Sequence, residues 1–248
     1  MPNEEFAGAG KVNTSFLKPL ERRLEPIVLP RIPLWIESQH LTMLTLLWSL
    51  LILVFSYLAK GNLRWLWLVS LMIVCQWVTD HYDGKLGKYR DSGLVRWGYY
   101  MDHLLDYFFL CSVIIGYGFI LPESSRLQLL LMLALFGAYE MSTFLAFAAT
   151  QELRISYLKI GPTEFRLALV IINALLIRYG TAQMISALKY VNAGAVVGLA
   201  VMIYNNHKKI WRLDMARKQY KAQAAQAHES TVERTIQPAP PVYELGSR

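Results

Sequence analysis

Charged residues and cysteines are both scarce in this chain of 248 residues. Asp, Glu, Lys and Arg make up 17% of it, against 54% hydrophobic residues, a balance that excludes an ordinary soluble domain. The two cysteines, Cys75 and Cys111, both fall inside apolar runs, so the sequence supports neither a disulfide framework nor a zinc site. Residues 1–33 lack a central apolar region, so we expect no cleaved signal peptide and infer that the first membrane span directs insertion.

The sequence contains several long apolar runs. Several of them approach twenty residues, the length that an α-helix needs to cross the hydrocarbon core of a bilayer. We therefore predict an all-α integral membrane protein built as a bundle of six transmembrane helices. The predicted spans are residues 41–59, 63–79, 98–121, 126–148, 162–179 and 184–204.

The segments that flank the bundle are polar and basic. Residues 1–40 form a predicted cytoplasmic arm, in which residues 11–36 mix apolar and basic side chains as an interfacial amphipathic helix does. Residues 205–248 form a basic cytoplasmic tail, predicted to be a surface helix to about Gln226 and disordered after it. The chain thus divides into the arm, a transmembrane domain over residues 41–204, and the tail.

The formal net charge of +7 lies mostly beside the apolar runs. Anionic lipid head groups are therefore a simpler partner for it than nucleic acid, which we do not expect to bind. If the N-terminus is cytoplasmic, most of the lysines and arginines also fall on the cytoplasmic side. We therefore predict that both termini, and the polar segment between the second and third spans, face the cytoplasm.

Four aspartates stand at the facing ends of the second and third apolar runs. Asp80 and Asp83 are three residues apart and Asp102 and Asp106 are four apart, so on helices each pair shares one face. Acidic side chains at the centre of a membrane helix cost roughly 2.5–3.5 kcal/mol each, so they are rarely without a function. Four facing carboxylates repel one another unless cations lie between them, and Mg²⁺ and Mn²⁺ suit all-oxygen ligands. The sequence therefore predicts a site for two such ions.

The aspartates and the glycines near them resemble the signature of the CDP-alcohol phosphotransferase family. That family carries D-x-x-D-G-x-x-A-R followed by G-x-x-x-D-x-x-x-D. This chain reads Asp80-x-x-Asp83-Gly84-x-x-Gly87-Lys88 and then Gly98-x-x-x-Asp102-x-x-x-Asp106. It departs at the Ala-Arg pair, where Gly87-Lys88 keeps the positive charge but loses the forked hydrogen bonding of arginine.

The resemblance implies a metal-dependent transferase of phospholipid biosynthesis, in which a CDP-linked donor gives a substituted phosphate group to an alcohol and releases CMP. One of the two substrates would be a lipid, and the enzyme would be a homodimer. Gly84 and Gly98 would let the nucleotide approach the backbone, and Lys88 would face its diphosphate. Asp106 would complete the second metal site or act as the general base. The metal ligands that the resemblance implies are Asp80, Asp83, Asp102 and Asp106.

Two further features resemble the branch of the family that transfers phosphocholine or phosphoethanolamine to diacylglycerol. His103 directly follows Asp102, which matches the D-H-x-x-D arrangement of this branch. Because an imidazole gains and loses a proton near neutral pH, His103 could act as the general base. The other interpretation is that His103 is a structural residue, with its hydrogen bonds satisfied at the membrane interface. Residues 161–164 read G-P-T-E, as in the same branch, and Glu164 either lines the cavity together with Arg166 or belongs to a helix start.

Three polar residues interrupt the later spans. Glu140 lies well inside the fourth, where it either serves the site or is a structural residue hydrogen-bonded across helices. Asn173 and Asn192 are expected to form interhelical hydrogen bonds rather than to bind a ligand.

The direction of the chemistry stays open at this point. His103 and the G-P-T-E stretch favour CDP-choline or CDP-ethanolamine as the donor to a lipid hydroxyl. The alternative is CDP-diacylglycerol as the donor to a soluble alcohol such as glycerol phosphate, inositol phosphate or serine. A cation- or proton-coupled transporter would string acidic residues through the depth of the membrane, and a catalytically silent scaffold would have lost an aspartate. Four intact aspartates gathered at one interface favour the enzyme.

Overall fold

The computed structural model describes residues 25–92, 94–151 and 162–236, with side chains up to residue 226. Every regular element in these ranges is a helix, which confirms the all-α prediction. Residues 11–24 of the predicted amphipathic helix lie outside the described residues. The longer helices are α2 (Ser38–Leu58), α3 (Leu66–Tyr89), α4 (Val95–Ile120), α5 (Arg126–Thr150), α6 (Pro162–Tyr179) and α7 (Ala182–Ile236). Short 3-10 helices are η2 (Leu29–Arg31), η3 (Leu63–Trp65) and η4 (Glu123–Ser125).

Four of the described helical segments are long and apolar enough to cross a membrane, which indicates an integral membrane protein. They are Ser38–Leu58, Val95–Ile120, Glu123–Thr150 and Ala182–Gln226. The two other predicted spans, α3 and α6, are not among them. Both helices include charged residues of the candidate site, Asp80 and Asp83 after the apolar run of α3 and Arg166 near the start of α6. The structure therefore supports four of the six predicted spans, and the spanning of the membrane by α3 and α6 stays a prediction.

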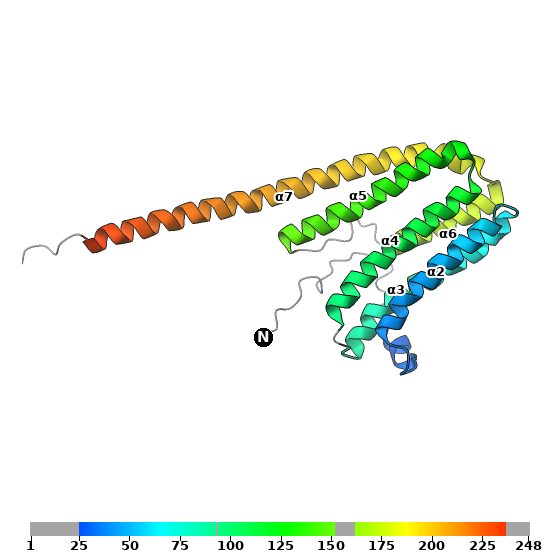
Figure 1. Ribbon diagram of the computed structural model, residues 1–248, viewed down its shortest axis with the longest axis horizontal. Helices are drawn as coiled ribbons and strands as arrows, with labels where there is room; N and C mark the ends of the chain where they lie inside the picture. The colour runs from blue at the N-terminus through cyan, green and yellow to red at the C-terminus, as the bar shows by residue number, and fades with distance from the viewer. Residues whose placement is uncertain (1–24, 93, 152–161, 237–248) are drawn as a thin grey trace, which may run out of the picture. The chain divides into compact units, whose positions relative to one another are not determined.

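Helices α2, α3 and α4 pack against one another, with α6 beside α3 and α5 beside α4 (Figure 1). Ile52, Leu66 and Ile73 are fully buried between them. The approach of α4 to α2 is close at Gly116, where an added Cβ would lie 2.5 Å from the Ser56 hydroxyl oxygen. A glycine is needed there so that the helices can meet.

The two halves of the aspartate signature lie on α3 and α4. The second predicted span ends at residue 79, but α3 continues as a helix to Tyr89 and so carries Asp80 and Asp83 on consecutive turns. A short turn follows, with Asp91 in the left-handed region (φ 49°), and α4 begins at Val95. Since both halves are helical, the spacings of three and four residues place each pair of aspartates on one face.

Buried polar side chains join the helices at depth. Tyr117 donates a hydrogen bond from its hydroxyl to Oδ1 of Asn173 (2.9 Å), and Asn173 donates through Nδ2 to the Ser70 hydroxyl (3.1 Å). Asn192 donates through Nδ2 to the carbonyl of Gln128 at 2.9 Å. These contacts confirm that Asn173 and Asn192 form interhelical hydrogen bonds.

The chain separates into two compact units, Met1–Val201 and Met202–Arg248. In the second unit, α7 runs on as a Lys- and Arg-containing helix to Ile236, beyond the helix end that the sequence places at about Gln226. Residues 222–236 include four alanines, two glutamines and two glutamates, and these residues favour helix, which explains the longer element.

Candidate metal centre

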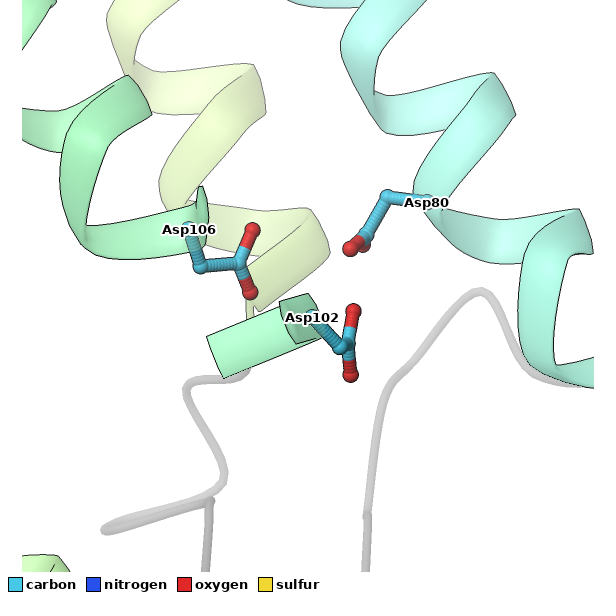
Figure 2. Close-up of side chains that lie close together, drawn as sticks. All are labelled: Asp80, Asp102 and Asp106. Atoms are coloured by element: carbon cyan, nitrogen blue, oxygen red, sulfur yellow. The ribbon is translucent and has the colours of Figure 1, made fainter. Parts of the chain in front are cut away.

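Three carboxylates meet between α3 and α4. Asp80 extends from α3, and Asp102 and Asp106 extend from consecutive turns of α4, so that the three side chains point toward one another (Figure 2). One oxygen of each lies within 4.8 Å of the others, and all three side chains are partly buried. The spacing of four residues within α4 and the contact of α3 with α4 bring them together.

This donor set fits a divalent cation. Three carboxylates offer only oxygen atoms, the ligands that Mg²⁺ and Mn²⁺ prefer. Partial burial strengthens the attraction of the cluster for a cation, because the surrounding dielectric is lower than that of water. The residues present therefore fit the metal chemistry that the sequence predicts, with Asp80, Asp102 and Asp106 as the group that could hold an ion.

An arginine from α6 reaches the same cluster. Arg166 is 5% exposed, and its Nη2 lies 2.8 Å from Oδ1 of Asp106 and 3.1 Å from Oδ2 of Asp80. Its Nε donates a hydrogen bond to Oε1 of Gln76 at 2.6 Å, and Gln76 donates through Nε2 to Oδ1 of Asp106 at 3.2 Å. The guanidinium also lies 5.6 Å from the centroid of the Phe109 ring. The centre therefore combines three carboxylates with one buried cation.

Arg166 was expected near the cavity from the sequence, whereas Gln76 was not predicted to belong to the site. Gln76 is fully buried on α3, four residues before Asp80 and therefore on the same face of the helix. A polar amide inside an apolar run, one turn before an aspartate of the signature, was the signal available in the sequence.

Asp83 lies outside this group of three. Its Oδ2 accepts a hydrogen bond from the Thr42 hydroxyl at 2.7 Å, and its Oδ1 accepts one from the backbone N–H of Gly84 at 2.5 Å. Ser38 donates from its hydroxyl to the Asp83 carbonyl at 2.8 Å. These contacts orient Asp83 toward α2, and its role as a metal ligand stays a prediction.

The glycines of the signature differ in their surroundings. Among the described residues, a Cβ added to Gly84 or Gly98 meets no heavy atom within 4 Å, whereas one added to Gly87 would lie 3.1 Å from the Ser38 hydroxyl oxygen. Open space therefore adjoins the two glycines that are predicted to lie beside the nucleotide. Lys88 is exposed in the last turn of α3.

His103 lies on α4 beside the carboxylates, with its Nδ1 2.7 Å from the Tyr99 carbonyl and 3.8 Å from Oδ2 of Asp102. A carbonyl only accepts, so Nδ1 carries a hydrogen and the lone pair of the neutral ring is on Nε2. Phe144 on α5 packs edge-on against the ring at 5.4 Å. The imidazole is thus held in one orientation next to the cluster.

On α6, Pro162 begins the helix and Glu164 lies in its first turn, as the sequence predicts for a helix start. Glu140 is partly buried on α5, the helix that packs beside α4.

Comparison with known proteins adds one finding. A family model described as CDP-alcohol phosphatidyltransferase matches residues 38–204, which is more than half of the chain. The matched region begins at the first residue of α2 and includes every residue of the centre described above. No match was found among curated proteins.

Proposed function

Because the chain belongs to the CDP-alcohol phosphatidyltransferase family, whose members are transferases of substituted phosphate groups, we propose that it transfers phosphocholine or phosphoethanolamine from a CDP-linked donor to diacylglycerol. The observation that carries this proposal is the convergence of Asp80, Asp102 and Asp106 inside the matched region. The His103 position and the G-P-T-E stretch support this donor over others.

The proposed metal ligands are the four aspartates of the signature, with Mg²⁺ or Mn²⁺ as the ions. Asp80, Asp102 and Asp106 already face one another, and Asp83 lies one turn further along α3. Two bound ions would neutralise the phosphoryl oxygens of the donor and fix its diphosphate for in-line displacement.

We assign the general base to His103. In the reaction the O–H bond of the acceptor breaks, its proton moves to Nε2, and the oxygen forms a new bond to phosphorus while CMP leaves with the electron pair of the old bond. The hydrogen bond of Nδ1 to the Tyr99 carbonyl supports this role, since it leaves the lone pair on Nε2. Asp106 is less suited, because its Oδ1 already accepts from Arg166 and Gln76.

The nucleotide would lie beside Gly84 and Gly98. The open space at both positions supports this placement, because a backbone without Cβ allows close approach. Lys88, in the last turn of α3, would face the diphosphate as a point charge.

An apolar cavity supports a lipid as one of the two substrates. It lies between α3 and α6, has a volume of about 140 Å³, and has Arg166 of the metal centre among its lining residues. Its lining is otherwise mainly hydrocarbon and aromatic surface, from Ile73, Val74, Trp77, Leu167 and Val170. A short segment of an acyl chain of diacylglycerol suits such a lining.

We further propose that α3 and α6 complete a bundle of six spans over residues 41–204, between a cytoplasmic arm (1–40) and a cytoplasmic tail (205–248). Their polar residues support this, because Gln76, Asp83 and Arg166 are buried against other helices and so would be shielded from lipid. The distribution of lysine and arginine supports both termini and the active site on the cytoplasmic side. A homodimer is proposed from the family resemblance.

The alternative is phosphatidyl transfer from CDP-diacylglycerol to a soluble alcohol. An anionic acceptor such as inositol phosphate needs positive charge in the site, and the charge of Arg166 is already paired with Asp80 and Asp106. Arg154 and Lys159, which the sequence also offers for such a pocket, lie outside the described residues.

The test is CMP release by the purified protein in detergent with Mg²⁺ or Mn²⁺. CDP-choline, CDP-ethanolamine and CDP-diacylglycerol are supplied separately, each with and without acceptor alcohols. We expect release from a CDP-aminoalcohol that rises with diacylglycerol. Release from CDP-diacylglycerol alone would replace the proposal by the alternative. Asp83→Ala should abolish turnover and leave expression intact, whereas Asp214→Ala, an exposed control in α7, should change neither.

A further inference from the structure

Arg166 of α6 is held in the metal centre by contacts with two other helices. It forms an ion pair with Asp80 of α3 and donates hydrogen bonds to Gln76 of α3 and Asp106 of α4. Gln76 is fully buried and fixes the Nε side of the guanidinium, while Phe109 of α4 lies 5.6 Å away. Because Gln76 is fully buried and Arg166 is only 5% exposed, removing Arg166 from the centre would leave the buried Gln76 amide oxygen and the two partly buried carboxylates without their cationic partner. Its positive charge is thus a permanent part of the site.

That charge changes the electrostatic balance of the cluster. The three clustered aspartates and the proposed fourth ligand, Asp83, carry four negative charges when ionised, and Arg166 carries one positive charge, so their sum is minus three. A single divalent ion leaves one negative charge. A second ion would give the centre a net positive charge, unless it arrives with an anionic group that compensates its charge. The diphosphate of a CDP-linked donor is such a group.

We propose that Arg166 is a fixed counter-charge that limits the donor-free centre to one tightly bound divalent ion, so that the second ion binds only together with the diphosphate of the nucleotide. This inference rests on the proposed function, since it assumes the aspartates as metal ligands and a CDP-linked donor. Arg166 acts through the carboxylates and is a positioning residue. Its consequence is an order of binding, in which the centre is complete for phosphoryl transfer only when the donor is present.

The experiment is a Mn²⁺ titration of the full-length protein in detergent, with free Mn²⁺ followed by electron paramagnetic resonance. Cytidine diphosphate serves as the probe for the nucleotide diphosphate. Without it, we expect one tight site per chain and a second ion that binds at least about tenfold more weakly. With it, both ions should bind tightly. Two equally tight ions without cytidine diphosphate would overturn the inference.

Two substitutions test the part played by the charge. Arg166→Gln removes it, so the second ion should bind at least about tenfold more tightly than in the wild type without cytidine diphosphate. Gln76→Glu is nearly isosteric and places a second carboxylate beside both Arg166 Nε and Asp106 Oδ1, in place of the amide that donates to Asp106. The added negative charge should shift the second ion in the same direction. If neither folded variant tightens the second ion, Arg166 does not limit it.

Arg178→Gln is the matched control, because it makes the same change at an exposed position of the same helix and should leave both ions as in the wild type. Thermal unfolding shows which variants are folded. If Arg166→Gln does not fold, Gln76→Glu and the wild-type titrations still show whether the positive charge limits binding of the second ion.

A failure of the proposed function would look different. No CDP-linked donor would then yield CMP, while the Mn²⁺ titrations of the wild type and variants would still show whether Arg166 limits the second ion.

Discussion

The Thr42 hydroxyl on α2 donates a hydrogen bond of 2.7 Å to Oδ2 of Asp83 on α3. Both side chains are buried, with exposed fractions of 3% and 6%. Ser38, one turn earlier on α2, donates to the backbone carbonyl of the same aspartate. The first membrane helix therefore holds the first half of the aspartate signature directly, although the two residues are 41 positions apart in the sequence.

Thr42→Val should therefore impair both stability and turnover. The substitution keeps the shape of the side chain but removes a donor to a buried carboxylate, at a cost of about 1–3 kcal/mol in the free energy of unfolding. Turnover should fall as well, because the orientation of Asp83 is lost. Thermal unfolding and CMP release measure the two effects. Thr45→Val, the same change at another buried position of α2, is the control, and equal losses in both variants would show that Asp83 needs no support from Thr42.

Gly84→Ala and Gly98→Ala should separate stability from substrate binding. Neither added Cβ meets a neighbour in the part of the chain that the structure describes, and alanine favours a helix over glycine by roughly 0.5–1 kcal/mol. The variants should therefore be as stable as the wild type or more so. The KM for the CDP-linked donor should nevertheless rise, because the methyl group occupies the space proposed for the nucleotide.

Gly116→Ala is the contrasting variant. Its Cβ would lie 2.5 Å from the Ser56 hydroxyl oxygen, so it should lower the melting temperature through helix packing and leave the KM of the folded fraction unchanged. An unchanged donor KM in both Gly84→Ala and Gly98→Ala would argue against a nucleotide beside these glycines.

Asn173→Leu should destabilise the protein without changing the metal centre. It leaves the buried Tyr117 hydroxyl and the Ser70 hydroxyl without the amide that joins them, and interhelical hydrogen bonds of this kind contribute about 1–2 kcal/mol at most. The melting temperature should fall, whereas Mn²⁺ affinity should match that of the wild type. A large loss of Mn²⁺ affinity in folded protein would mean that this network also supports the centre.

His103→Gln should remove the acidic limb of the pH profile of kcat, because the group that must lose its proton before turnover is then absent. The maximal rate should drop by about 10²–10⁴-fold, the usual contribution of a general base. His81→Gln is the control, since His81 contacts Lys85 one turn later on α3 and is not assigned to proton transfer. A retained acidic limb in His103→Gln would transfer the role of base to Asp106.

Much of the fold could be predicted because its rules are local. Apolar runs located all six long helices to within a few residues at most of their ends, apart from the extensions of α3 and α7. The helical period and the spacings of three and four residues also predicted that each aspartate pair lies on one helix face. Asn173 and Asn192 were correctly assigned to interhelical hydrogen bonds, because an amide inside an apolar helix needs a partner from another helix.

Local rules could not predict which side chains meet. Asp80 and Asp83 share a face of α3, yet only Asp80 joins the carboxylates of α4, while Thr42 engages Asp83. Arg166 lies 90 positions from Gln76, and no spacing in the sequence pairs them. Such contacts depend on how α2, α3, α4 and α6 pack.

The sequence by itself therefore determined the membrane helices and the four aspartates with their family signature, since hydrophobic length and helical period are properties of a single segment. Only the tertiary structure decided the composition of the centre: three carboxylates, a buried arginine and a glutamine that joins them. The physical reason is that a charge is stabilised or opposed by whatever lies within a few ångströms of it, and helix packing sets those neighbours.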